Sequence, residues 1–182
     1  MTLPVIKPKR DEVLKCVARF SELTPVTGGL PDINLDECKR TFYSVLGFKQ
    51  PKGDDAFSPF GDAVTPRISH LKAGFGMAYV SAKPGKGVLM HNHDTNETFV
   101  VMKGKWKMEW EGEKGNDSVV LGPLDTISFP IGIQRRFECV EAAQGSEEGL
   151  MLAVIEGDDP QAEYSPEAKN RIETAGISMA KN

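Results

Sequence analysis

The sequence lacks long apolar runs, contains few cysteines and shows no concentration of positive charge. Its apolar runs, such as residues 149–155, have the length of a strand, which excludes a membrane-spanning helix. The net charge is −4 and no basic stripe occurs, which argues against a nucleic acid as partner. The cysteines are 3 in number and widely spaced, so we expect small buried side chains and no disulfide framework at Cys16, Cys38 and Cys139.

The first residues, Met-Thr-Leu-Pro-Val-Ile-Lys, lack the apolar stretch of a secretory signal peptide. We therefore expect a cytoplasmic protein. The chain of 182 residues is long enough for one domain with a sizeable hydrophobic core.

Residues 1–66 predict a helical and irregular N-terminal extension. Apolar residues recur at helical spacing over residues 11–20. Residues 34–46 are a second predicted helix, with Asn34 as its N-cap, Glu37 completing a capping box and Gly47 following its end. Glycines and prolines in residues 50–66 indicate an irregular connector.

From Arg67 the sequence changes to short strands. Trp106, Met108 and Trp110 alternate with charged residues, and this period of two is typical of a strand with one buried side. Many short strands without intervening helices predict an all-β fold, an antiparallel barrel or jelly roll, over residues 67–157. A C-terminal tail, residues 158–182, follows, with a helix at 166–174 capped by Ser165. The strands are predicted at 77–82, 88–93, 98–102, 105–110, 118–121, 126–129, 134–140 and 150–155.

Two histidines and a glutamate stand out within this β-rich stretch. His91 and His93 are two residues apart, so a strand would point both imidazoles to one face. Residues 94–96 can turn the chain and bring Glu97 back to the same place. Two neutral imidazoles and a carboxylate that converge on one point predict a divalent transition-metal site.

The spacing G-x5-H-x-H-x3-E-x6-G, from Gly85 to Gly104, resembles the first signature of the cupin superfamily at every defined position. The resemblance implies an antiparallel β-barrel, a ligand site in the barrel interior and frequent dimerisation, often through N-terminal segments. We therefore expect a homodimer. Because cupins host many unrelated activities, the resemblance predicts fold better than function.

A second cupin signature, G-x5-P-x-G-x2-H-x3-N, is only partly matched. Pro130 and Gly132 fit, but Leu124 stands at the first glycine position and Arg135 at the histidine position. Cys139 replaces the asparagine. In this superfamily the histidine supplies a further metal ligand, and arginine does not ligate metals because it stays protonated.

The motif therefore retains His91, His93 and Glu97 as expected ligands for iron, manganese, zinc or nickel. If Arg135 points inward to about 5 Å from the ion, the two would repel by roughly 6–7 kcal/mol at an effective dielectric of about 20. A bound anion would offset this repulsion. We therefore expect Glu97 and Arg135 to be catalytic residues and the ligand to be a small anion, a carboxylate or enolate. In a competing interpretation no metal binds, and Glu97 and Arg135 form an ion pair.

Three classes of function remain open, and whether the protein is an enzyme is not decided. The first is a metal-dependent dioxygenase that acts on a small carboxylated or enolic compound. The second is a sugar-type isomerase or lyase, in which Glu97 or a metal-bound water moves protons. The third is a non-catalytic module that binds a small molecule.

His70, the remaining histidine, is expected to be structural, although it could replace the missing ligand.

Overall fold

A computed structural model describes residues 2–48 and 65–179. The predicted connector at residues 50–66 lies almost entirely outside this part of the chain. None of the helices in the described residues has both the length and the apolar character needed to cross a membrane.

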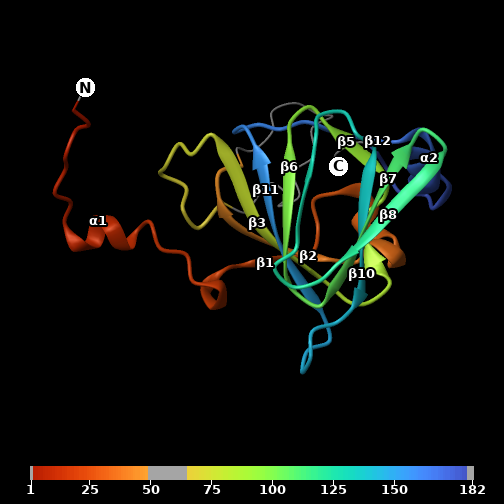
Figure 1. Cartoon of the computed structure of the whole chain (residues 1–182), viewed down its shortest axis with the longest axis horizontal. Helices are drawn as coiled ribbons and strands as arrows, with labels where there is room; N and C mark the ends of the chain where they lie inside the picture. The colour runs from red at the N-terminus through yellow and green to blue at the C-terminus, as the bar shows by residue number, and fades with distance from the viewer. Residues whose placement is uncertain (1, 49–64, 180–182) are drawn as a thin grey trace.

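The strands form two antiparallel sheets that face each other, as Figure 1 shows. The all-β class predicted from the sequence is thereby confirmed. The first sheet has the order β1 (Pro25–Val26), β2 (Thr41–Leu46), β3 (Phe75–Ala82), β11 (Gly149–Glu156), β6 (Glu97–Lys103) and β9 (Thr126–Phe129). The second has the order β12 (Ala162–Tyr164), β5 (His91–His93), β10 (Arg135–Glu141), β7 (Lys105–Gly112) and β8 (Gly115–Leu121), with β4 (Lys86–Gly87) also paired to β10.

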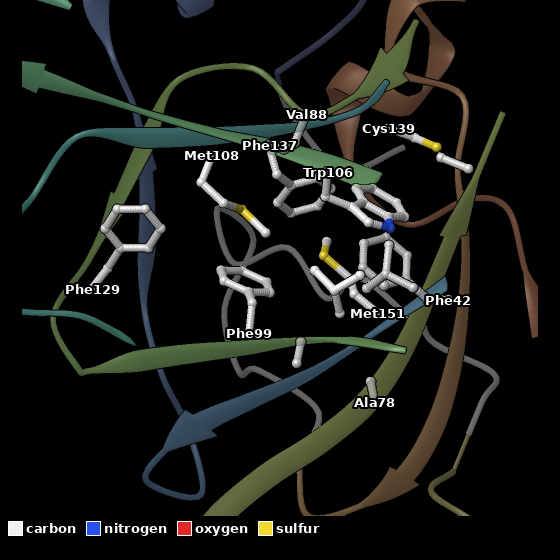
Figure 2. Close-up of a cluster of buried hydrophobic side chains, with 14 of the residues drawn as sticks. Phe42, Ala78, Val88, Phe99, Trp106, Met108, Phe129, Phe137, Cys139 and Met151 are labelled. Carbon is white, nitrogen blue, oxygen red and sulfur yellow. The ribbon is translucent and has the colours of Figure 1, made fainter. Parts of the chain in front are cut away.

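The hydrophobic core lies between the sheets and contains mainly aromatic and sulfur-bearing side chains (Figure 2). Trp106 and Met108 are fully buried, as the alternation in β7 predicts, and Trp110 packs half-buried against the same cluster. Phe137 lies edge-on to both Trp106 and Phe99, with ring centroids 5.8 and 5.4 Å apart. Such large buried rings contribute most of the apolar burial that stabilises a barrel of this size.

The predicted helix at residues 34–46 is wrong. This segment contains the end of one 3-10 turn (Pro31–Asn34), a second turn (Asp36–Cys38) and strand β2. Strand β2 pairs with β3, with a register shift between Ser44 and Leu46, because Thr41 to Leu46 are mostly β-branched or aromatic and alternate between half-buried and buried positions up to Ser44. The sheet pairing overrides the local capping signal.

The first predicted helix, at residues 11–20, is much shorter than expected. Helix α1 spans Arg10–Leu14 and buries no side chain, and a 3-10 turn follows at Phe20–Glu22. Cys16, just beyond α1, is exposed, so the expectation of a buried thiol is wrong at this position. It is correct for Cys38 and Cys139.

The C-terminal helix α2, Pro166–Thr174, matches its prediction, and the Ser165 hydroxyl accepts a hydrogen bond from the Ala168 amide. Ile172 of this helix packs against Leu35 and Cys38 from the N-terminal turns. The N-terminal and C-terminal segments therefore meet on the second sheet, beside the chain that leads into β5. The division of the chain at residues 66 and 157 stays a prediction, although β1 and β2 already pair within the first sheet.

Candidate metal centre

Strands β5 and β6 bring the three expected ligands together. His91 and His93 lie on the same side of β5, with ring centroids 5.2 Å apart, and Glu97 begins β6 after a short turn. One potential ligand atom from each of the three residues lies within 4.8 Å of the others. Among the described residues this is the group of three or more such side chains that could hold a metal ion.

Arg135 points into the same site. It opposes His91 in the β5–β10 pairing, and its side chain is 1% exposed. Its Nη2 donates to Glu97 Oε2 at 2.7 Å, and its Nη1 donates to the carbonyl oxygen of Ile133 at 3.2 Å. The guanidinium carbon lies 5.8 Å from the centroid of the Phe129 ring. A buried cation therefore occupies the side of the site where the superfamily signature has its histidine.

Both histidines are neutral at physiological pH. Burial, followed by the neighbouring His93 and Arg135, lowers the pKa of His91 to about 4. Burial, followed by Arg135, lowers the pKa of His93 to about 3. Since a metal binds the unprotonated nitrogen, these shifts keep the lone pairs available over the whole physiological pH range.

Hydrogen bonding orients the His91 ring. Its Nδ1 lies 2.8 Å from the carbonyl oxygen of Leu89, which can only accept a hydrogen bond. Nδ1 therefore carries the proton, and Nε2 keeps the lone pair that a metal requires. The Nε2 atom of His93 lies 3.8 Å from Glu97 Oε2. The Nδ1 atom of His93 and the Nε atom of Arg135 are buried without a hydrogen-bond partner in the described residues.

This donor set fits a divalent transition metal. Ligands at about 2.0–2.2 Å from an ion lie roughly 3 to 3.5 Å from one another in tetrahedral or octahedral geometry. The observed 3.8 Å between His93 and Glu97 is within a small side-chain adjustment of that range. The site also contains two unprotonated imidazoles and one carboxylate, the set found in sites that keep open coordination positions. Glu97 would have to share its carboxylate between the ion and Arg135.

Several solved structures have a fold similar to that of this chain. A vicilin from Corylus avellana (hazelnut) matches with a TM-score of 0.53 and 13% identity, over 91% of this chain and 44% of the other. An oxalate decarboxylase variant from Bacillus subtilis matches with a TM-score of 0.50 and 15% identity, over 88% of this chain and 36% of the other. These two matches show that the chain has a cupin-like barrel fold. An oxalate oxidase also matches, with a TM-score of 0.45, 20% identity and 58% of each chain covered.

The chain covers less than two thirds of the length of each of these three structures. No family model matches the sequence, and no curated protein matches it. The likeness therefore concerns the barrel, and only the residues of its own site bear on the activity of this protein.

The structure brings together every residue that the motif singled out: His91, His93, Glu97 and Arg135. Their roles as ligands and catalytic groups stay predictions. His70 does not join the group and lies in an exposed loop, with Nε2 3.5 Å from Cys16 Sγ. Burial raises the pKa of the Cys139 thiol, which makes this residue a poor nucleophile.

Sequence reasoning missed a group of side chains behind His91. Asp32, Arg40 and Tyr164 come from distant parts of the chain and are joined by hydrogen bonds. Asp36, Glu37 and Lys39 lie between Asp32 and Arg40, so no sequence pattern singles these two residues out, and only the folded chain shows that they meet.

Proposed function

We propose that this protein is a metal-dependent enzyme that binds a divalent transition metal through His91, His93 and Glu97 and acts, as an oxygenase, on a small carboxylated or enolic compound. Arg135 captures the anionic group of that compound. The observation that carries the proposal is the position of Arg135, a fully buried cation that already contacts one of the three expected ligands.

The shared carboxylate couples the metal to the anion. Glu97 Oε2 accepts a hydrogen bond from Arg135 Nη2 at 2.7 Å, and the same oxygen lies 3.8 Å from His93 Nε2. If Glu97 held a metal ion, its carboxylate would be shared between the ion and Arg135, and the buried guanidinium would be less well neutralised. An unpaired buried cation is strongly unfavourable, so a carboxylate or enolate that replaces Glu97 as its partner stabilises the complex. Metal and anion should therefore increase each other's affinity by the same factor.

Each residue then has a distinct task in the reaction. The bound metal supplies a Lewis acid that polarises oxygen atoms of the substrate or activates oxygen. Arg135 orients the anionic group through its planar array of donors, which suits a carboxylate. The Phe129 ring beside the guanidinium restricts the positions that it can take. Glu97 balances the positive charge of the ion and of Arg135.

The test is a calorimetric titration of metal-free protein with Mn²⁺, without and with oxalate as a probe of carboxylate binding. The parent should bind Mn²⁺ at least tenfold more tightly with oxalate present. Arg135→Gln should bind Mn²⁺ more tightly than the parent without oxalate, because no cation competes for Glu97, and should lose the oxalate enhancement.

The neighbouring Arg136 provides a matched control. Its side chain is half-buried on the outer side of β10 and pairs with Glu109 at 3.1 Å. Arg136→Gln removes the same charge from the adjacent position and should keep the oxalate enhancement. An equal enhancement in Arg135→Gln and in the parent would rule out Arg135 as the anion-binding group.

The ion pair between Glu97 and Arg135 also favours a second candidate, a non-catalytic module that binds a small molecule without metal. In that case the carboxylate serves only to neutralise the buried cation. Mn²⁺ would then fail to bind in the titration, and small ligands would raise the melting temperature without being turned over.

A further inference from the structure

A buried charged network lies behind the metal centre. Arg40 Nη2 donates to Asp32 Oδ1 at 2.8 Å, and both side chains are 0% exposed. The Tyr164 hydroxyl donates to the same oxygen at 2.8 Å, and burial next to this carboxylate raises the pKa of the tyrosine. Three segments that are far apart in the sequence thus converge: a 3-10 turn, the residues before β2, and the last strand, β12.

This network forms hydrogen bonds to the backbone of the segment that leads into β5. The Leu89 amide donates to Asp32 Oδ2 at 3.2 Å, and Arg40 Nη1 donates to the Gly87 carbonyl at 3.1 Å. Leu89 in turn accepts, through its carbonyl oxygen, the hydrogen bond from His91 Nδ1 at 2.8 Å. A continuous path of short contacts therefore runs from the Asp32 carboxylate to the His91 imidazole.

Stability alone gives a weak reason for such a network. A fully buried ion pair loses about as much through desolvation as it gains through attraction, and apolar residues of similar volume often serve at least as well. A buried network that specifies one backbone position, in contrast, needs directional donors and acceptors. Here the specified backbone is that of Leu89, which holds a candidate metal ligand.

We propose that Asp32, supported by Arg40 and Tyr164, is a positioning residue for His91. It acts through Leu89, whose carbonyl oxygen fixes the His91 ring with the proton on Nδ1 and the lone pair on Nε2. The importance of that lone pair rests on the proposed function, but the orientation of the ring does not. Partners behind a metal ligand typically change metal affinity 10- to 100-fold when they are removed.

The experiment uses two variants of the full chain. Asp32→Asn removes the charge, and Tyr164→Phe removes a single hydrogen bond to Asp32. The first readout is the ¹⁵N spectrum of the histidine side chains in metal-free protein, which distinguishes the two neutral tautomers. The parent should show His91 protonated on Nδ1, and Asp32→Asn should show a mixture of tautomers. A purely structural role would not move this signal.

The second readout is Mn²⁺ affinity. Asp32→Asn should weaken it 10- to 100-fold, and Tyr164→Phe should weaken it by less than tenfold. Val80→Ala, in a core strand of the other sheet, lowers stability without touching the network and should leave the affinity unchanged.

Parent-like tautomer and affinity in a folded Asp32→Asn protein would overturn the proposal. If that variant does not fold, Tyr164→Phe decides in the same way, by a partial shift of the tautomer signal or by its absence. If the parent binds no Mn²⁺, the proposed function fails, and the tautomer spectrum alone still supports or overturns the positioning role of Asp32.

Discussion

His91 and His93 combine burial with a cationic neighbour, and both effects keep their imidazoles neutral. An exposed histidine pair would be partly protonated at pH 6 and would compete poorly for a metal. Here burial and Arg135 lower the pKa values of His91 and His93 to about 4 and 3. Arg135 therefore helps to keep the two imidazoles deprotonated, but its charge also repels a metal ion. A substrate anion bound to Arg135 removes this repulsion and leaves the effect on the histidines.

These pKa values predict how the stability of the metal-free protein depends on pH. Unfolded histidines bind protons below their ordinary pKa of 6.5, whereas the folded ones stay neutral down to about 4 and 3. The free energy of unfolding should thus fall as the pH decreases from about 6.5 to 4, by up to about 1.4 kcal/mol per pH unit for each histidine. Urea unfolding at several pH values measures this slope. A His91→Gln, His93→Gln double variant should lose it, and parallel curves for the two proteins would contradict the assignment.

Glycines in the strands and turns explain how the sequence motif specifies the shape of the site. Gly85 and Gly104, the outer glycines of the first cupin signature, have φ values of 79° and 77°, which side chains rarely adopt. In the second signature Leu124 takes the glycine position and keeps a φ of 72°, in a turn closed by the Asp125 amide and the Gly122 carbonyl. Leu124 thus takes, at the glycine position of this signature, a backbone conformation that favours glycine.

Gly87 in β4 illustrates the close packing next to the site. A methyl group at this position would overlap the carbonyl oxygen of Phe137 in β10. We expect Gly87→Ala to lower the free energy of unfolding by about 2–4 kcal/mol, because β4 must move away from β10. Urea unfolding provides the measurement. Gly28→Ala, where a methyl group meets open space, should change stability by less than about 1 kcal/mol, and equal effects of the two substitutions would contradict this account.

Local sequence patterns predicted the strands that alternate in polarity or carry the motif. They failed where contacts between residues far apart in the sequence determine the structure. The period of two in β7 and the Ser165 cap of α2 are properties of neighbouring residues, so the sequence alone sufficed to predict them. Strand β2 forms because β3 lies beside it, and the network around Asp32 forms because Tyr164 returns from the far end of the chain. No short window of the sequence contains either contact. His91, His93 and Glu97 were predictable because one turn separates them.

At the scale of the whole molecule, the described part of the N-terminal segment exposes several apolar side chains. Leu3, Val5 and Ile6 are 84%, 87% and 81% exposed, and Figure 1 shows this segment running away from the barrel. A run of exposed apolar side chains is unfavourable in water, so we predict that a second copy of the chain covers it in a homodimer. Light scattering should give twice the mass of the chain. Val5→Ser with Ile6→Ser should weaken the dimer, and a parent protein that is monomeric at micromolar concentration would refute it. The predicted cytoplasmic location stays a prediction.

The most direct measurement is the metal content of protein purified without a histidine tag and loaded anaerobically with iron, manganese or zinc, beside His91→Ala treated in the same way. We predict close to one metal ion per parent chain and a loss of nearly all of it in the variant, since two remaining ligands do not hold an ion tightly. Equal, substoichiometric metal in both proteins would contradict the metal centre and leave the Glu97–Arg135 ion pair as the structure of a metal-free site.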